Sequence, residues 1–427
     1  MIRALVVAIF LVGLTLRVHH LGTFPEPNRT ADEYAWTWSG MTLLGEGVPR
    51  AWSWLPGYSD FNQHTWHGNE YRLVRPWFDH PPLFGLYVGA WMRAAGVRDI
   101  WAVELGTARA AMLPLYAATF FLFFAIARRY GGEEQALLAL AFFAAAPTAV
   151  WNGRLVMAEQ MMLPVALAGW WALLRFTESR RRGWLVAVAV AAALLPLVKA
   201  AALGLALFLF TIAVLRKERA LVVAVCAGAT VGLAVWALYG AHYDWKLFRE
   251  IQRLQSTRFT DFGGFAALVF NPRVVEKGFG YLPFILGFMT LLSDLRDGRH
   301  AEVGLFGAIY AAAIAFFLPW NMYGWYLMPL YPVMAFGLAS FAVRAWRQAA
   351  TGAAWAWLLF SATYLSWIAC DANVVKPQHW RFVYLALFVL LPVATIATEK
   401  RQRLWRTGFG VLVGLQWLGD AWYSFRK

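Results

Sequence analysis

Acidic and basic side chains that could carry out chemistry occur at a few separate places in a chain that is otherwise strongly apolar. A carboxylate can accept a proton from a hydroxyl group, and cationic side chains can bind a phosphate. Charges at membrane depth cost about 2.5–3.5 kcal/mol each, so they are retained chiefly where they pair or act. The candidate site residues, from four stretches of the sequence, are Asp32, Glu33, Asp79, His80, Arg154, Glu159 and Lys199.

Lys199 has the most unusual sequence context among these candidates. It lies in the stretch Leu194-Leu-Pro-Leu-Val-Lys-Ala-Ala-Ala-Leu203, between two apolar runs with no polar loop to solvate it. The structural alternative is a lysine that ends a membrane span and extends its ammonium group to the interface. A functional lysine would instead meet an anionic ligand at that depth.

Each of the other stretches also has a structural alternative. Asp32 and Glu33 could form the first turn of a helix capped by Thr30. Asp79-His80-Pro81-Pro82 could be the start of a helix with proline in its first turn, and Glu159 could pair locally with Arg154. These alternatives explain the stretches singly, but not why all four should occur on one side of a membrane.

The elements that must hold these residues are membrane helices. Of the 427 residues, 60% are hydrophobic and 15% are charged, whereas soluble domains are about 45–50% apolar and about 25% charged. The apolar runs are close to the ~20 residues needed to cross a bilayer. A soluble enzyme is thereby excluded, and the sequence predicts an all-α, polytopic integral membrane protein.

Charge and cysteine content exclude other classes. The net charge of +14 comes from basic residues in short connectors between apolar runs, where anionic lipid and insertion bias explain it better than nucleic acid does. Cys226 and Cys370 both lie in apolar runs, so neither a disulfide framework nor a thiolate metal site is expected. The apolar start, residues 1–16, lacks a cleavage site after it and is interpreted as the first span.

Orientation follows from the basic clusters, because lysine and arginine mark the cytoplasmic side. Placing the clusters inside puts all candidate site residues outside. This holds only if residues 83–96 do not cross, so we interpret them as an interfacial helix. About thirteen transmembrane helices result, in a single domain covering residues 1–427. It has a first extracytoplasmic loop at 22–100 carrying interfacial helices, a second at 241–276, and no soluble C-terminal domain.

Several motifs resemble those of the GT-C glycosyltransferases. They are Asp32-Glu-Tyr after the first span, Asp79-His-Pro-Pro-Leu at the end of the long loop, and Arg154-Leu-Val-Met-Ala-Glu. Leu-Pro-Leu-Val-Lys199 and Tyr326-Leu-Met-Pro-Leu-Tyr-Pro extend the similarity. The ordered set is similar to the branch of protein O-mannosyltransferases and lipid A aminoarabinose transferases. The resemblance implies a GT-C fold in the cytoplasmic (inner) membrane, with the active site facing the extracytoplasmic side.

The resemblance also implies a reaction. Such enzymes move a sugar, with inversion, from a polyprenyl-phosphate carrier of the undecaprenyl or decaprenyl type to a hydroxyl acceptor on a protein, lipid or glycan. Asp32 matches the presumed base, and Glu33 and Asp79 are the other expected catalytic residues, which would position the acceptor or a metal. Lys199, Arg154 and His80 would bind the donor phosphate, and Glu159 would be a supporting acid.

A divalent cation such as Mg, Mn or Zn is a further expectation, with Asp32, Asp79 and Glu159 as hard oxygen ligands. Lys199 and Arg154 could replace it electrostatically. The rival function is a transporter or flippase of a lipid-linked sugar, which predicts internal repeats with helices broken at matching positions. The sequence shows no such repeat, and a long loop with carboxylates favours an enzyme. The expected partners are the lipid-linked sugar donor, an envelope acceptor and membrane lipids, without nucleic acid.

Overall fold

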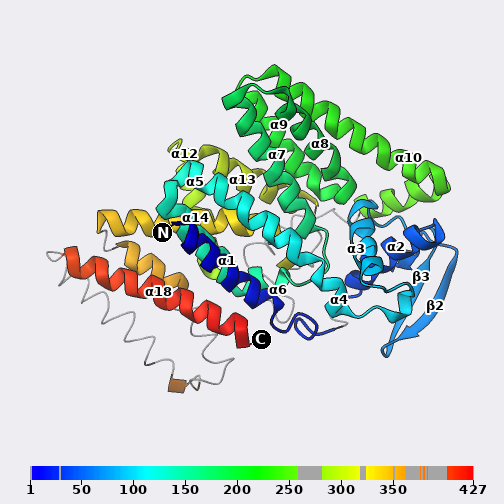
Figure 1. Cartoon of the computed structure of the whole chain (residues 1–427), viewed down its shortest axis with the longest axis horizontal. Helices are drawn as coiled ribbons and strands as arrows, with labels where there is room; N and C mark the ends of the chain where they lie inside the picture. Colours follow the sequence, from blue (N-terminus) through cyan, green and yellow to red (C-terminus); the bar gives the residue numbers. More distant parts are fainter. Residues whose placement is uncertain are drawn as a thin grey trace.

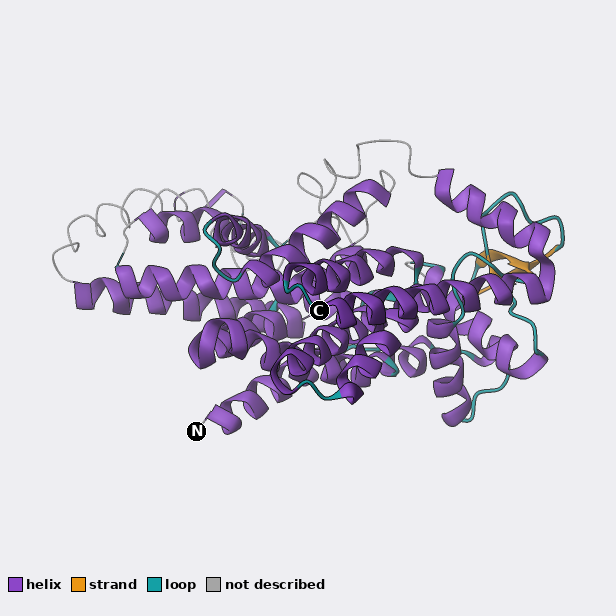
Figure 2. Ribbon diagram, turned by 90° about the horizontal axis from the view of Figure 1, so that it is seen from above, coloured by secondary structure: helices purple, strands orange, loops and turns teal. Residues whose placement is uncertain are grey.

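The computed structural model describes residues 2–27, 30–257, 281–317, 324–349, 352–361 and 402–426, and the single positions 376, 378, 379 and 382. Within these residues the chain is predominantly helical (Figure 2). The main α-helices are α1 (Ile2–Val18), α2 (Asp32–Glu46), α3 (Leu83–Ala94), α4 (Leu105–Ala110), α5 (Met112–Ala145), α6 (Pro147–Asn152), α7 (Glu159–Ser179), α8 (Arg182–Val198), α9 (Leu203–Leu215), α10 (Arg219–Thr257), α12 (Leu282–Arg296), α13 (Ala301–Phe317), α14 (Tyr331–Gln348) and α18 (Gln402–Arg426). Short 3₁₀ helices are η1 (Ile100–Ala102), η2 (Ala200–Ala202) and η3 (Gly324–Leu330).

Long apolar helices support an integral membrane protein. Among the described residues, three helical stretches are long and apolar enough to cross a bilayer: Leu105–Ala145, Arg219–Thr257 and Gly324–Gln348. Shorter apolar helices occur at Arg182–Val198, Ala200–Leu215, Ala301–Ala315 and Gly352–Ser361. The count of about thirteen spans therefore stays a prediction.

Two of the long helices are divided by a residue outside the helical conformation. In α5 it is Gly132, with φ 74°, which follows the basic pair Arg128-Arg129. In α10 it is Asp244, whose carboxylate accepts a hydrogen bond from the backbone N–H of Leu247 at 2.9 Å and so caps the segment that follows. The helical segment after Asp244, up to residue 257, is thus a separate unit within the predicted second loop, and residues 258–276 of that loop lie outside the described residues.

The segment 22–100 contains a small sheet that the all-α prediction missed. The strands β1 (Ala51–Trp52), β2 (Phe61–Trp66) and β3 (Asn69–Val74) are antiparallel, in the order β1-β3-β2. Between β2 and β3, His67 and Gly68 have φ of 47° and 76°. Two consecutive positive φ values form the tight turn that suits the twist of a hairpin. His-Gly between two short runs was the signal that could have revealed it.

Helices α2 and α3 pack side by side and in parallel. A Cβ on Gly40 would lie 1.7 Å from the carbonyl oxygen of Gly85, so only glycine permits this approach. Further along, Gly45 of α2 lies opposite Arg93 of α3. With 12 residues, α3 is about 18 Å long and cannot cross a hydrocarbon core of about 30 Å. The structure confirms that residues 83–94 form a short helix, and its interfacial position stays a prediction.

The helical bundle is extended, with α2, α3 and the sheet at one end (Figure 1). In the bundle α8 packs against α7 and α10, α14 packs against α5 and α12, and α1 packs against α5. The core consists of their facing apolar side chains, among them Phe120, Phe142, Trp170 and Phe336. The segments that carry the candidate site residues meet where α2 approaches the connector between α6 and α7, described next.

Candidate functional site

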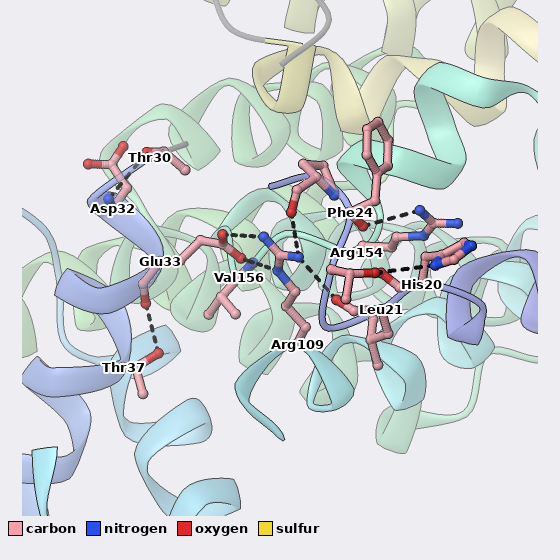
Figure 3. A network of polar contacts seen from close by, with 12 residues as sticks. His20, Leu21, Phe24, Thr30, Asp32, Glu33, Thr37, Arg109, Arg154 and Val156 are labelled. Atoms are coloured by element: carbon pink, nitrogen blue, oxygen red, sulfur yellow. Dashed lines mark hydrogen bonds and ion pairs between the residues drawn. The ribbon is translucent and has the colours of Figure 1, made fainter. Parts of the chain in front are cut away.

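Glu33 forms a fully buried ion pair with Arg109, a residue at the end of α4 (Figure 3). The guanidinium donates from Nε to Oε1 at 2.8 Å and from Nη2 to Oε2 at 2.7 Å, and the backbone N–H of Val156 also donates to Oε1 at 3.0 Å. Arg109 Nη1 donates to the carbonyl oxygens of Leu21 and Pro25. Glu33 therefore fixes the start of α2 against two other segments.

Arg154 is also fully buried, and its guanidinium donates hydrogen bonds to backbone carbonyls. Nη1 donates to the carbonyl oxygen of Phe24 at 3.1 Å, and Nη2 donates to those of Leu16 and Ser424 at 2.6 and 3.4 Å. The local pair with Glu159 is not among these contacts. These hydrogen bonds join α1, the chain after it and α18, so the guanidinium contributes to the packing of these segments.

Asp32 is the first residue of α2 and is half-buried. Its backbone N–H donates to Thr30 Oγ1 at 3.2 Å (Figure 3), whereas the N-cap residue of α2 is Ala31, not the expected Thr30. One turn later, Trp36 stacks on His80 with ring centroids 4.6 Å apart and planes at 11°. Residues i and i+4 share a helix face, so Asp32 and His80 lie on the same side of α2, about one turn apart.

Asp79 is buried and held by two hydroxyl groups. Ser53 Oγ donates to Oδ2 at 2.7 Å, and Tyr58 OH donates to Oδ1 at 2.8 Å. The Tyr58 hydroxyl in turn accepts from the backbone N–H of Phe78 at 2.7 Å. Burial, and then the neighbouring Asp79 carboxylate, raise the pKa of Tyr58 well above its ordinary value, so it stays protonated and continues to donate. The loop carboxylate is thereby fixed in orientation.

Lys199 pairs with Glu159. Lys199 interrupts the helical run between α8 and η2 with extended backbone angles, and its Nζ donates to Glu159 Oε1 at 2.6 Å. The ammonium nitrogen also lies 4.6 Å from the centre of the Tyr326 ring in η3. The second oxygen of Glu159, Oε2, is buried without a hydrogen-bond partner among the described residues. The pair is therefore only partly satisfied.

One connector joins these groups. Between α6 and α7, a stretch of six residues carries Arg154 and Val156, and Glu159 begins α7 directly after it. Val156 bonds Glu33 on α2, and Glu159 bonds Lys199 after α8. The structure thus brings Glu33, Glu159 and Lys199 to this connector, while His80 stacks on Trp36, one turn after Asp32 on α2.

In the described part of the chain, the expected metal ligands Asp32, Asp79 and Glu159 are not gathered into one group. Among the described residues there is no group of three or more His, Cys, Asp or Glu side chains that could hold an ion. Asp79 and Glu159 accept hydrogen bonds from hydroxyl and ammonium donors. Binding of a divalent cation by these carboxylates therefore stays a prediction.

Sequence reasoning missed several partners in the site. Arg109 opens an apolar run, and a lone charge there is a signal for a buried pair, but nothing in the sequence identifies Glu33 as its partner. Ser53 and Tyr58 are ordinary loop residues in the sequence. Tyr326 lies in a recognised motif, but its contact with Lys199 depends on the packing of η3.

The comparisons with known proteins concern the family and the fold. Residues 79–239 match the model of the family described as dolichyl-phosphate-mannose-protein mannosyltransferase. The crystal structure of ArnT from Cupriavidus metallidurans bound to undecaprenyl phosphate has a TM-score of 0.61, with 18% identity over 99% of this chain and 75% of that one. The apo state of ArnT has a TM-score of 0.58, with 17% identity over 99% and 76%. No curated protein matches the sequence.

At these identities the likeness to ArnT is one of fold. The family match covers Asp79, His80, Arg154, Glu159 and Lys199, which are the later candidate site residues. The match over residues 79–239 supports the resemblance expected from the motifs, and the chain shares the fold of ArnT.

Proposed function

We propose that the protein moves a sugar from a polyprenyl-phosphate carrier to a hydroxyl acceptor on the outer face of the cytoplasmic membrane. ArnT, whose fold it shares, was crystallised with undecaprenyl phosphate. The observation that carries the proposal is the connector between α6 and α7, which joins Glu33 beside Asp32 to the Glu159–Lys199 pair. A carboxylate and a cation from distant segments therefore meet in one region, as transfer from a phosphate carrier requires.

In the proposed reaction Asp32 accepts the proton of the acceptor hydroxyl. The hydroxyl oxygen forms a bond to the anomeric carbon, and the bond from that carbon to the carrier phosphate oxygen breaks with its electron pair. Attack opposite the leaving phosphate inverts the anomeric centre. Because the phosphate leaves as a stable anion, no general acid is required.

Asp32 suits the role of base better than the other carboxylates do. It is half-buried, whereas Glu33 and Glu159 are 0% and 1% exposed and Asp79 is 9% exposed. Glu33 is occupied by Arg109 and Val156, so we assign it to positioning the start of α2. Asp79 orients the loop that presents His80.

Lys199 and His80 are the proposed phosphate-binding side chains. Lys199 has three N–H groups and gives one to Glu159, so others can meet an anion. His80 is half-buried against Trp36. Arg154 is excluded from this assignment because its guanidinium donates to backbone carbonyls in the interior.

The test is a transfer assay on purified protein with a polyprenyl-phosphate sugar and extracts of envelope glycolipids and glycoproteins as acceptors. Asp32→Asn should lower the transfer rate by about 10²–10⁴-fold, because a general base is lost while the shape is kept. The matched control is Asp60→Asn, an exposed aspartate of the same segment, which should retain the rate. A rate for Asp32→Asn above about one tenth of wild type would remove Asp32 from the base role.

A further inference from the structure

A polar cavity lies at the opposite end of α2 from Asp32. Its volume is about 300 Å³, and its lining includes Thr42 and Glu46 of α2, Arg50, and Arg93 of α3. Ten residues of α2 separate Asp32 from Thr42, which is about 15 Å along the axis. The cavity is therefore distinct from the region proposed for sugar transfer.

Three guanidinium groups surround this cavity, and the carboxylates balance only part of their charge. Arg50 pairs with Glu46 at 2.7 Å. The Asp99 side chain caps η1 by accepting the backbone N–H of Trp101 at 3.0 Å. Among the described residues, no carboxylate lies within ion-pair distance of Arg93 or Arg98. The lining therefore carries three positive and two negative charges, and neither Arg93 nor Arg98 has an ion-pair partner among the described residues.

Helix ends explain only one of these arginines. Arg93 is in the last turn of α3, where a cation is favoured by the carbonyl ends of the helix. Arg98 lies between α3 and η1, outside both helices. In addition, Arg50 Nε is buried without a hydrogen-bond partner among the described residues, which leaves one more unsatisfied donor beside the cavity.

The cavity also has an aromatic wall. The Trp101 ring lies 5.5 Å from Trp38 of α2 and 5.4 Å from Trp66 of β2, measured between ring centroids. Trp38 Nε1 donates to the carbonyl oxygen of Ile100 at 2.9 Å, which holds η1 against α2. The guanidinium groups could bind the phosphate of an organic phosphate ester, and the Trp101 ring could contact the organic part of the same molecule.

We propose that this cavity binds a phosphate group, with Arg93 and Arg98 as its principal ligands. The close approach of α2 and α3 at Gly40 and Gly85 brings Arg93 of α3 to the end of α2, and Arg98 lies in the chain that follows α3. The same chemistry is found in the headgroup of an anionic lipid and in a soluble phosphate. The short helix α3 is expected at the membrane surface, where an anionic headgroup would reach the cavity.

The experiment is calorimetric titration of the full-length purified protein in neutral detergent. The probes are dioctanoyl phosphatidic acid, inorganic phosphate and, as the uncharged comparison, dioctanoylglycerol. The variant carries Arg93→Gln and Arg98→Gln. The matched control is Arg249→Gln, an exposed arginine on α10 that does not line the cavity.

The double variant should lose at least about tenfold in affinity for phosphatidic acid, since a hydrogen bond to a charged group contributes about 1.5–3 kcal/mol. An effect on phosphatidic acid alone supports a lipid headgroup as ligand, and an equal effect on inorganic phosphate supports a soluble one. Equal affinity of the double variant and wild type overturns the proposal. So does an equal loss in Arg249→Gln, or binding of dioctanoylglycerol as tight as that of phosphatidic acid.

The thermal unfolding midpoint separates binding from helix capping. If Arg93 and Arg98 only stabilise helix ends, the double variant lowers the midpoint and leaves phosphatidic acid affinity unchanged, which again overturns the proposal. A second variant, Arg93→Lys with Arg98→Lys, keeps both charges and should retain part of the affinity. Because both arginines are exposed, neither variant removes a core contact.

Discussion

Replacing Lys199 tests two roles at once, because it pairs with a buried acid. Lys199→Met removes the only cation within ion-pair distance of Glu159 among the described residues, and Glu159 is 1% exposed with one oxygen already unpartnered. Breaking a buried pair from one side typically costs about 3–5 kcal/mol. We therefore expect Lys199→Met to lower the free energy of unfolding by about that amount and to weaken donor binding as well.

A second substitution separates the two effects. In Lys199→Met with Glu159→Leu, both charges are replaced by apolar groups, and such exchanges are often neutral or stabilising. Stability should return close to that of wild type. Donor affinity should not return, because the loss of a hydrogen bond to phosphate corresponds to about 10–150-fold. Lys199→Arg, which keeps a cation, should retain part of the affinity if the site accommodates the larger group.

The assays are thermal unfolding in detergent and titration with a polyprenyl phosphate. Glu159→Gln serves as the control, since it leaves the lysine cation in place and should bind the donor at least as well as wild type. If the double variant recovers both stability and donor affinity to within about threefold of wild type, Lys199 is only the partner of Glu159. The phosphate-binding role would then be refuted.

Three further outcomes follow from the fold. If the helix at residues 83–94 lies on the outer surface, a cysteine introduced as Arg98→Cys in a cysteine-free background should react with an impermeant reagent added from outside. Labelling only from the cytoplasmic side would contradict this topology. Arg109→Met should destabilise the protein by about 3–5 kcal/mol in thermal unfolding, because Glu33 then loses its buried partner; an unchanged midpoint would show that the pair is not needed. Gly40→Ala should lower the thermal unfolding midpoint, since its Cβ would lie 1.7 Å from a carbonyl oxygen of α3. The control is Gly47→Ala, just past the end of α2. Nothing lies within 4 Å of a Cβ there, so this variant tests only the cost of a positive φ.

The sequence identified most residues of the candidate site, but it did not identify the residues that they contact. Asp32, Asp79, His80 and Lys199 stand out in the sequence because charges are rare in an apolar chain, and the cost of burying them makes each one informative. The same cost applies to Arg154, which the structure shows bound to backbone carbonyls. A buried arginine that satisfies the backbone and one that binds a ligand look alike in a sequence, since both sit beside apolar runs.

The sequence by itself determined the membrane class, the short helix at residues 83–94 and the break at Lys199, because each depends on local properties: hydropathy, run length and the position of charges. Only the tertiary structure decided that Glu33 belongs to Arg109, that Asp79 belongs to Ser53 and Tyr58, and that Lys199 belongs to Glu159. These partners are separated by 76, 26, 21 and 40 residues. Pairing over such separations is set by how whole helices pack and which buried charges must be satisfied together, and no local pattern encodes that choice.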